Sequence, residues 1–372
     1  MNKSILIVNK FFEPHVGGIE TVVKQQAEWF AREGWNVRVL VFLDKKAGSY
    51  NGNGDFEVLE ISPFFVFKKL PFSFYFLWKL FVLARTSDVV IGHYPFPLFD
   101  FFVSIFPFST KKFYLVWHSE IVSQKYLKML VHPFTQILLR RVKVAVTSER
   151  LKLSSRYLQG VTCDIVPLCI DFSKYPFEKL SLTTVKPNFV DDFGHELPED
   201  FSLFFGRLTG YKNVSWILNL AQRWPDKNFV ICGAGDDEDL ISLAIEKGMK
   251  NIYWVSKFLT HDEKATVFYC ASLYLFPSHL ETEAFGITQL EALSMGTRVL
   301  NQDLDSGVPS VTAGMPHCLT AHRHDFDDYC SKFEELNSIR LSLDQRWDIR
   351  RAAEVKFDEI SISRRMVDFV RN

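Results

Sequence analysis

The chain has 372 residues, 47% of them hydrophobic and 23% charged, which is enough for two globular domains with their own cores. The net charge of -1 hides an asymmetry, because residues 1–170 carry 21 Lys and Arg but only 13 Asp and Glu. A basic first half indicates an anionic partner, and the absence of a repeated basic and aromatic module argues against nucleic acid.

The apolar segments are too short or too interrupted to predict a membrane span. The first apolar segment stops before Asn9 and Lys10 and is too short for the core of a signal peptide. Charged residues and prolines break the phenylalanine-rich runs at 64–83 and 95–108, so neither offers the roughly 20 apolar residues of a spanning helix. We therefore expect a cytoplasmic protein. Six cysteines without a CxxC pair or a histidine at ligand spacing predict reduced thiols and no metal site.

Short apolar strands alternate with helical patterns along the whole chain. In the first half the predicted strands are Ile5–Val8, Val37–Phe42, Asp88–Ile91, Phe113–Trp117, Val144–Thr147 and Ile165–Leu168. In the second half they are Ser202–Phe205, Asn228–Cys232, Ile252–Val255, Leu273–Phe276 and Arg298–Asn301. Continuous apolar strands between helices indicate parallel sheets covered on both faces. The pattern predicts an α/β fold with two doubly wound, Rossmann-like domains.

The expected domain boundaries follow from composition. Residues 1–170 form the first domain and residues 201–345 the second, and the segment 171–200 between them is rich in Pro, Ser and acidic residues, as in a linker. The tail 346–372 is expected to be helical and to pack back on the first domain. Its candidate anchors are Phe357, Ile360 and Met366.

Lysines and aromatic residues are interleaved in one stretch of the first domain, at Phe65, Phe67, Lys68, Lys69, Phe72, Phe76, Trp78 and Lys79. Such a surface is typical of proteins that lie on anionic lipid, so we expect an anionic membrane surface as a partner. The alternative is a helical hairpin whose phenylalanines are core residues.

Three loops of the first domain carry candidate functional residues. Gly17 and Gly18 lie between the first strand and a helix, where backbone N–H groups can approach a phosphate or a sugar. His118 follows the fourth strand, and His93 lies in the equivalent loop one strand earlier. Because ligands bind at the carboxyl ends of parallel strands, we expect His118 to touch a bound sugar. A structural hydrogen bond is the alternative for either histidine.

In the second domain, Arg207 and Lys212 lie five residues apart in a loop between a strand and a helix. Arg offers planar donors and Lys a point charge, so the pair can clamp a diphosphate. We expect both side chains to be exposed. The alternative is a pair of ordinary surface cations.

The segment Glu283–Glu291 places two carboxylates around the start of a predicted helix. The N–H groups of Phe285 and Gly286 would point outward there, as a phosphate requires, and Gly286 would let the ligand approach closely. Eight residues at about 1.5 Å rise separate the carboxylates by about 12 Å, the span of a sugar and a ribose flanking a diphosphate. The alternative is a helix cap and a solvated helix face.

Together these segments resemble glycosyltransferase family 4, the retaining, nucleotide-sugar-dependent enzymes of the GT-B architecture. The resemblance covers nearly the whole chain and rests on the GGIE turn, the GRLxxxK motif around Arg207 and Lys212, and EAFG-x₄-E. The segments HYPFP at His93–Pro97 and WHSEIVSQK at Trp117–Lys125 look like bacterial cell-surface polysaccharide members, many of them mannosyltransferases.

The resemblance implies two Rossmann-like domains facing a cleft, with the catalytic residues Glu283 and His118 approaching the donor sugar from opposite domains. Arg207 and Lys212 would bind the diphosphate and stabilise its growing charge, and Glu291 would accept hydrogen bonds from the ribose. The other implied donor-binding residues are Gly17, Gly18, Lys257, Phe258, Phe285 and Gly286. Those implied on the acceptor side are His15, His93 and Glu120.

The resemblance therefore predicts a retaining hexosyltransferase that moves a sugar from a nucleotide diphosphate sugar, with GDP-mannose favoured, to a lipid-linked saccharide of O-antigen or capsule type. No cofactor or metal is implied, and the leaving phosphate would accept the acceptor's proton. Two alternatives share the fold. A nucleotide-sugar epimerase would need acid and base carboxylates and no acceptor groove, and a non-catalytic nucleotide-sugar-binding subunit would be expected to lack His118 or Glu283.

Overall fold

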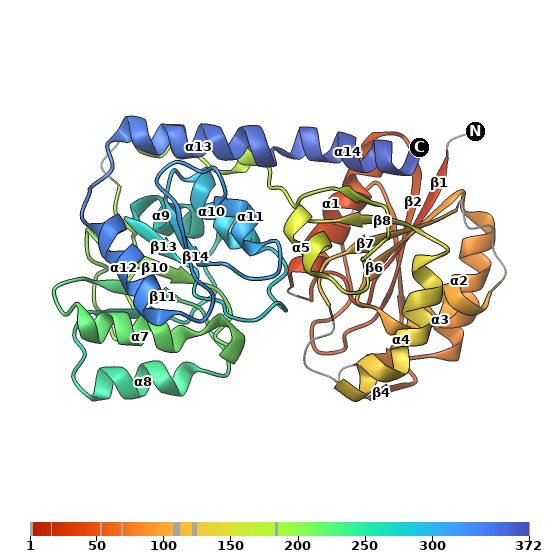
Figure 1. Ribbon diagram of the computed structural model, residues 1–372, viewed down its shortest axis with the longest axis horizontal. Helices are drawn as coiled ribbons and strands as arrows, with labels where there is room; N and C mark the ends of the chain where they lie inside the picture. The colour runs from red at the N-terminus through yellow and green to blue at the C-terminus, as the bar shows by residue number, and fades with distance from the viewer. Residues whose placement is uncertain are drawn as a thin grey trace. The chain divides into compact units, whose positions relative to one another are not determined.

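The computed structural model describes residues 3–15, 17–52, 54–67, 70–106, 112–120, 125–182 and 185–371. The chain forms two compact units, which are coloured by residue number in Figure 1. Unit 1 comprises Met1–Leu168 and Ile360–Asn372, and unit 2 comprises Cys169–Glu359. Residues 171–200 therefore belong to unit 2, and this segment includes the short helix α6 at Phe177–Ser181.

Unit 1 is built on a parallel seven-stranded sheet with the order β3-β2-β1-β6-β7-β8-β9. The strands are β1 Ser4–Val8, β2 Asn36–Phe42, β3 Glu57–Ile61, β6 Val89–Tyr94, β7 Phe113–Trp117, β8 Lys143–Val146 and β9 Cys163–Ile165. A separate antiparallel hairpin pairs β4 Phe65–Phe67 with β5 Leu70–Phe72. The strand order reverses between β1 and β6, which is where open sheets of this type bind ligands.

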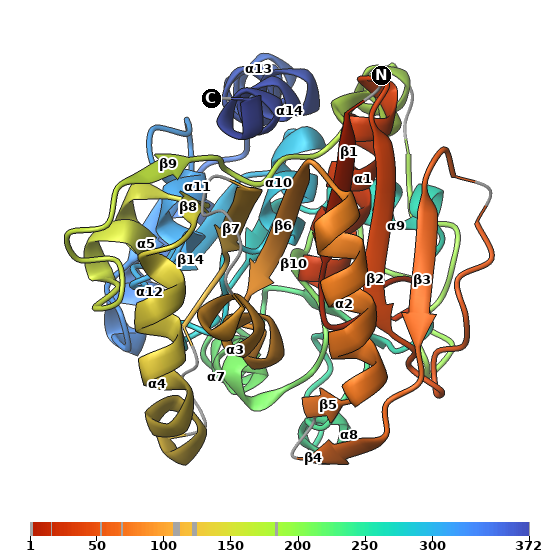
Figure 2. The same ribbon diagram turned by 90° about the vertical axis from the view of Figure 1, so that its right-hand side faces the viewer.

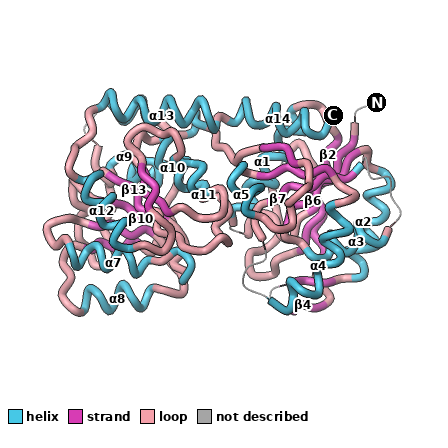
Figure 3. Tube along the Cα trace, in the orientation of Figure 1, coloured by secondary structure: helices cyan, strands magenta, loops and turns pink. Residues whose placement is uncertain are grey.

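Helices cover both faces of the unit 1 sheet, as Figures 2 and 3 show. They are α1 Gly18–Arg32, α2 Phe74–Thr86, α3 Pro97–Ile105, α4 Lys125–Leu139, α5 Glu149–Ser154 and α14 Glu359–Arg371. Because side chains alternate along a strand, Trp117 of β7 joins the core shared with α2, α3 and α4, whereas Tyr114 faces the other way. The Tyr114 hydroxyl donates to Val370 O of α14 at 2.9 Å, and its ring packs edge-on against Phe369.

Unit 2 repeats this plan with a parallel six-stranded sheet in the order β12-β11-β10-β13-β14-β15. The strands are β10 Ser202–Phe205, β11 Phe229–Cys232, β12 Ile252–Val255, β13 Leu273–Leu275, β14 Val299–Gln302 and β15 Leu319–Ala321. The helices are α7 Val214–Arg223, α8 Glu238–Glu246, α9 His261–Cys270, α10 Ile287–Ser294, α11 Val308–Thr312, α12 Phe326–Asn337 and α13 Leu343–Phe357. The order reverses between β10 and β13, so a second switch point lies there.

The main core of unit 2 lies between the sheet and helices α7, α8 and α12. Away from this core, α10 packs against α9 and α13. The buried Arg350 of α13 donates to the carbonyls of Ser294, Tyr175 and Phe172, which joins α13 to the end of α10 and to the start of unit 2. The bond to Ser294 O satisfies one of the carbonyl groups at the carboxyl end of α10, where an α-helix leaves four without partners.

The predicted α/β fold is confirmed, and the predicted helical tail forms α13 and the final helix, α14. Only the part of the tail from Ile360 onward belongs to unit 1, so the prediction that all of 346–372 packs on the first domain was wrong for α13. Met366 is buried in unit 1, Phe357 is buried in unit 2 against Phe285, and Ile360 is 60% exposed and is not an anchor. Ile360 follows the break between the two helices at Asp358, so the helical register of α14 turns its side chain outward. Within the described part of the chain, no helix combines the length and apolar character needed to cross a membrane.

Candidate functional site

The Arg207 loop leaves β10 at the switch point of unit 2 and is fixed to the loop after β11. Gly206 N donates to Cys232 O and Leu208 N to Ala234 O, both at 3.0 Å. A Cβ at Gly233, where φ is +151°, would lie 1.9 Å from Gly206 O, so this close approach requires glycine. The loop is thus rigid at its base, and the Arg207 side chain is exposed as predicted.

Lys212 ends the same loop and forms an ion pair with Glu283, which lies in the loop after β13. Both side chains are only 11% exposed, and Lys212 Nζ also lies 4.8 Å from the centre of the Phe276 ring. The expectation that Lys212 is exposed was therefore wrong, because the carboxylate and the aromatic face draw its ammonium inward. The structure brings together two residues that sequence reasoning assigned separately to diphosphate and sugar.

Helix α10 begins beside this pair, and Gly286 is its N-cap in the left-handed conformation with φ of +82°. A Cβ there would lie 2.5 Å from Phe276 Cζ, so both the backbone and the space require glycine. Among the described residues, the amides of Phe285 and Gly286 donate to no acceptor, as the sequence predicts. The Phe285 side chain is buried, so only its backbone is available to a ligand.

Glu291 lies in the second turn of α10 and is held from two sides. Its Oε1 accepts a hydrogen bond from the Tyr175 hydroxyl at 2.9 Å and forms an ion pair with Lys264 of α9. Its Oε2 is buried and has no hydrogen-bond partner among the described residues. Burial, and then the charge of Glu291, raise the pKa of Tyr175, which keeps the phenol protonated as a donor. The carboxylate is fixed in place with one oxygen uncommitted.

Sequence reasoning missed both residues that hold Glu291. Tyr175 lies 116 positions away along the chain and Lys264 lies 27 away, so no motif spacing connects them to Glu291. No pattern in the sequence singles out either residue as a partner of Glu291.

Lys257 and Phe258 follow β12, on the same edge of the sheet as the other strand ends. Lys257 Nζ lies 2.8 Å from Glu263 Oε1, and the hydrogen bond from Lys257 is the main cause that lowers the pKa of Glu263 to about 2. The Phe258 side chain is 88% exposed. Among the described contacts, none joins Lys257 or Phe258 to the Lys212–Glu283 pair.

In unit 1 the predicted residues also lie at strand ends near the switch point. Gly17 is the extended N-cap of α1 and Gly18 is its first residue. His15 Nδ1 lies 2.7 Å from Asp44 Oδ2 in the loop after β2, and this hydrogen bond lowers the pKa of Asp44. Glu120 accepts a hydrogen bond from Ser155 Oγ at 2.7 Å.

His93 and His118 form a hydrogen-bonded pair at the carboxyl ends of β6 and β7. His93 belongs to β6 and His118 follows β7, and His93 Nδ1 lies 2.9 Å from His118 Nε2. Both side chains are buried, and burial lowers the pKa of His118 to about 4 and that of His93 well below its ordinary value. Both imidazoles are therefore neutral at pH 7.

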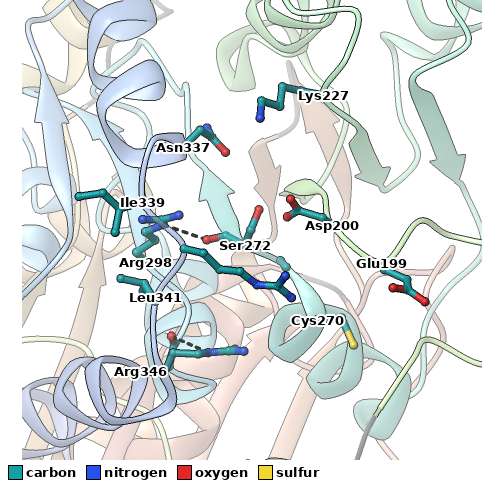
Figure 4. A pocket seen from close by; sticks show the side chains of 13 residues that line it. Glu199, Asp200, Lys227, Cys270, Ser272, Arg298, Asn337, Ile339, Leu341 and Arg346 are labelled. Carbon is teal, nitrogen blue, oxygen red and sulfur yellow. Dashed lines mark hydrogen bonds between the residues drawn. The ribbon is translucent and has the colours of Figure 1, made fainter.

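A cavity of ≈ 120 Å³ lies at the opposite edge of the unit 2 sheet, and Figure 4 shows the side chains that line it. Asp200, Ser272 and Arg298 line it where they precede β10, β13 and β14. It therefore marks the amino ends of the strands and contains none of the predicted site residues. Among the described residues, no three His, Cys, Asp or Glu side chains gather as a metal site.

Comparison with known proteins identifies relatives over most of the chain. A family model described as Glycosyltransferase Family 4 matches residues 16–174, and one described as Glycosyl transferases group 1 matches residues 185–340. The chain is 27% identical over 316 residues to the O-antigen chain mannosyltransferase C of Escherichia coli, covering 82% of this chain and 83% of that protein. It is 26% identical over 298 residues to a D-rhamnosyltransferase of Pseudomonas aeruginosa, covering 78% and 75% respectively.

Among solved structures, a sucrose-phosphate synthase from Thermosynechococcus elongatus aligns with a TM-score of 0.78 at 16% identity, covering 100% of this chain and 98% of that one. Together with the two doubly wound units, this likeness confirms the GT-B fold that the sequence predicts.

Proposed function

The chain belongs to glycosyltransferase family 4, and from this premise we propose that it is a retaining hexosyltransferase that uses a nucleotide diphosphate sugar. The proposed acceptor is a lipid-linked saccharide of a bacterial surface polysaccharide of the O-antigen type. The similarity to an O-antigen chain mannosyltransferase supports this acceptor class and makes GDP-mannose the donor to test first. No cofactor is part of the proposal.

The main observation that supports the proposed donor site is the geometry of the Glu291 carboxylate. Tyr175 and Lys264 fix Oε1, and Oε2 has no hydrogen-bond partner among the described residues. An ionised carboxylate oxygen accepts hydrogen bonds only, so its natural ligand is a pair of donors such as the ribose hydroxyls. Preorganisation by two neighbours lowers the cost of holding the carboxylate in the binding geometry.

The proposed diphosphate site combines the N–H groups of Phe285 and Gly286 with the cations Arg207 and Lys212. Amides at the start of a helix carry a positive partial charge, and Arg207 adds planar donors at the exposed edge. We assign Gly17, Gly18, Lys257 and Phe258 to donor binding from the family pattern alone. Lys257 and Phe258 would contact the base.

Glu283 and His118 are the proposed catalytic residues that contact the donor sugar. As the bond between the anomeric carbon and the leaving phosphate breaks, negative charge grows on the diphosphate, and Arg207 and Lys212 would stabilise it. The acceptor hydroxyl would form the new bond on the same face and pass its proton to a phosphate oxygen. Glu283 already neutralises Lys212, so donor binding would share that ammonium between carboxylate and phosphate.

We assign the acceptor side to unit 1, with His15 and Glu120 as its candidate contacts, whereas His93 is buried and hydrogen-bonded to His118. Its membrane contact would be the aromatic surface, which we define as Phe64, Phe65, Val66, Phe74, Tyr75 and Trp78. These side chains are between 50% and 79% exposed and lie on the β4–β5 hairpin, just before it and in the first turns of α2. The half-buried Phe72 links the hairpin to α2, because its ring centre lies 5.2 Å from that of Phe65 and 5.0 Å from that of Phe74.

The structure divides the phenylalanine run into a buried and an exposed part. Phe76, Phe96, Phe99 and Phe102 are fully buried, as a core interpretation requires. The aromatic surface is the exposed remainder, and exposed rings near lysines are typical of proteins at the lipid interface. Lys79 lies on α2 and is partly exposed, whereas Lys68 and Lys69 lie outside the described residues. We propose that the protein is peripheral at the cytoplasmic face of the membrane.

A donor screen followed by product analysis tests the proposed function. Thermal unfolding with GDP-, UDP- and dTDP-sugars should single out one nucleotide, since a ligand that binds the native state stabilises it by RT ln(1 + [L]/Kd). Transfer from that donor to a lipid-linked saccharide should give a product with the anomeric configuration of the donor. An inverted product would refute retention, and donor conversion without any acceptor would favour the epimerase.

The transfer assay combined with calorimetry separates the proposed subsites. His118→Ala and Glu283→Ala should lower transfer while binding of the bare nucleoside diphosphate stays nearly unchanged in calorimetry, because both residues are assigned to the sugar. A large loss of nucleotide affinity in either variant would place that residue in the nucleotide subsite instead.

A further inference from the structure

The hydrogen bond between His93 and His118 lies in the plane of both rings. The rings are 11° from coplanar with their centres 5.2 Å apart, and the two nitrogens are 2.9 Å apart. His93 pairs with Val116 in the β6–β7 register, so His118, two residues further on, lies on the same face as His93. The backbone N–H of His118 also donates to Tyr94 O, which fixes the start of the loop.

A single proton must occupy the space between these two nitrogens. Each neutral imidazole has one N–H and one bare nitrogen, and a hydrogen bond needs one of each. Two arrangements are therefore possible. Either His118 donates from Nε2 to a bare His93 Nδ1, or His93 donates from Nδ1 to a bare His118 Nε2.

The other nitrogen of His93 decides between these arrangements. His93 Nε2 is buried and has no hydrogen-bond partner among the described residues. If His118 were the donor, this nitrogen would carry a proton and become a buried N–H without an acceptor, which folded proteins largely avoid. If His93 is the donor, the same nitrogen is only an unused acceptor, which is the less costly of the two.

We propose that His93 is a positioning residue that donates from Nδ1 to His118 Nε2 and so fixes His118 as the Nδ1–H tautomer. His118 then offers an N–H donor, and its Nε2 is occupied and cannot serve as a base. The complementary group on a ligand is a hydrogen-bond acceptor, such as a sugar hydroxyl or ring oxygen. This step rests on the proposed function only in taking that ligand to be the donor sugar.

The tautomers can be observed directly, without any assay of transfer. In long-range ¹H–¹⁵N spectra of the labelled full-length chain, a protonated and a bare imidazole nitrogen have widely separated ¹⁵N shifts. Spectra of His93 and His118 variants assign the two rings. We expect both rings to be protonated at Nδ1 and bare at Nε2 at pH 7. A His118 ring that is protonated at Nε2 in the wild-type protein would overturn the proposal, whatever the activity.

Two substitutions of His93 extend the test to function. His93→Phe removes the donor, and we expect His118 to lose its fixed tautomer and kcat to fall roughly tenfold, the scale of one hydrogen bond. His93→Asn keeps an N–H near the position of Nδ1 and should retain both the His118 signal and most of the kcat. His132→Phe removes another hydrogen-bonded histidine of unit 1 and is the matched control, with no expected change at His118.

The outcomes distinguish this inference from the proposed function. If His93→Asn behaves like His93→Phe in both the spectrum and the rate, His93 does not act through its donor and the positioning role is wrong. If the tautomers are as expected but His118→Ala transfers sugar at the wild-type rate, the positioning of His118 stands and its role in transfer does not.

Discussion

Lys212 and Glu283 neutralise each other at the switch point of unit 2, where both side chains are largely shielded from water. The loop after β10 and the loop after β13 are thereby held together before any ligand binds. Each residue thus has a structural role in addition to its proposed role in catalysis, and substitutions can separate the two.

We predict that Lys212→Met destabilises folding by about 3 kcal/mol, because it leaves the Glu283 carboxylate shielded and without a counter-charge. Arg207→Met should change stability by less than about 0.5 kcal/mol, since Arg207 is exposed. Both substitutions should slow transfer by raising its activation free energy by about 2–4 kcal/mol, the scale of one preorganised donor. Denaturant unfolding and steady-state kinetics measure the two effects.

The double variant Lys212→Met/Glu283→Gln is the control for this assignment. Because residue 283 is then uncharged, no buried charge lacks a partner. The stability should return close to that of the wild-type protein, while the activity stays low. If the two substitutions instead add in their cost, the ion pair is not what holds the loops, and packing of the Lys212 stem accounts for the loss.

We predict that Tyr175→Phe weakens binding of the nucleoside diphosphate although Tyr175 itself is not assigned to the ligand. The phenol is one of the two groups that fix Glu291 Oε1, so its loss frees the carboxylate to move. The expected loss of affinity is up to about tenfold, the net value of one hydrogen bond. Glu291→Gln should cost more, because it removes the charged acceptor itself. Calorimetry with GDP measures both.

Tyr253→Phe is the matched control, since Tyr253 lies on β12, at a distance along the sheet from α10. Its affinity for GDP should equal that of the wild-type protein. If the Tyr175→Phe, Glu291→Gln and Tyr253→Phe variants all bind GDP with equal affinity, Glu291 is not part of the donor site. The main observation that supports that site would then be lost.

Local pattern was sufficient to predict most of the fold. Ten of the eleven predicted strands match observed strands to within three residues at each end, because continuous apolar runs between helices have few other solutions. The predicted strand Ile165–Leu168 shares only Ile165 with β9, which lies earlier, at Cys163–Ile165. The strands that were missed, β3 and β15, are an outer strand with the sequence EVLEI and a three-residue outer strand, so neither has the apolar run of a central strand. The β4–β5 hairpin was missed because its phenylalanines also fit a helix.

The site was predictable only where it is local in sequence. Glu283, Gly286 and Glu291 lie in one segment, and α10 begins between the two carboxylates, at Ile287, as predicted. The partners of these residues come from elsewhere: Lys212 for Glu283, and Tyr175 and Lys264 for Glu291. The spacing of residues along the sequence does not reveal tertiary contacts of this kind. The same holds for the His93–His118 bond, which depends on strand register.

Asp100 of α3 should make stability depend on pH. Its carboxyl is fully buried, accepts one hydrogen bond from Thr135 Oγ1 at 2.8 Å and leaves Oδ1 without a partner among the described residues. Burial raises its pKa from 3.8 to about 7. Because the folded-state pKa lies above the unfolded one, the protonated carboxyl favours the native state at low pH, and this contribution is lost as pH rises from about 4 to 7.

We therefore predict that Asp100→Asn stabilises the protein at pH 8 and has little effect near pH 4. The amide cannot ionise, so the variant avoids a cost that reaches roughly 4 kcal/mol above pH 7 for a pKa raised to about 7. Denaturant unfolding of both proteins across this pH range measures the difference. Thr135→Val is the control, because it removes the donor that favours the ionised form and should enlarge the pH dependence. Parallel stability curves for Asp100→Asn and the wild-type protein would contradict the prediction.

The aromatic surface should bind anionic membranes through both its rings and nearby lysines. We predict that the protein sediments with vesicles containing anionic lipid and that the double substitution Phe74→Ser/Trp78→Ser weakens this binding by at least about tenfold. Transfer of one ring from water to an apolar phase is favourable by roughly 1.5–3 kcal/mol, and partial burial in the lipid interface returns a share of that for each ring. Both side chains are already exposed, so folding should be unaffected.

Two comparisons separate aromatic from electrostatic binding. Phe193→Ser removes an exposed phenylalanine of unit 2 and should leave sedimentation unchanged. Lys79→Glu should weaken binding to anionic vesicles at low salt only, since each lysine contributes roughly 1 kcal/mol of screened attraction. If the wild-type protein fails to bind neutral and anionic vesicles alike, the aromatic surface contacts the acceptor or another protein, and the membrane role is wrong. If the double variant binds as tightly as the wild-type protein, lysines alone hold the protein to the bilayer.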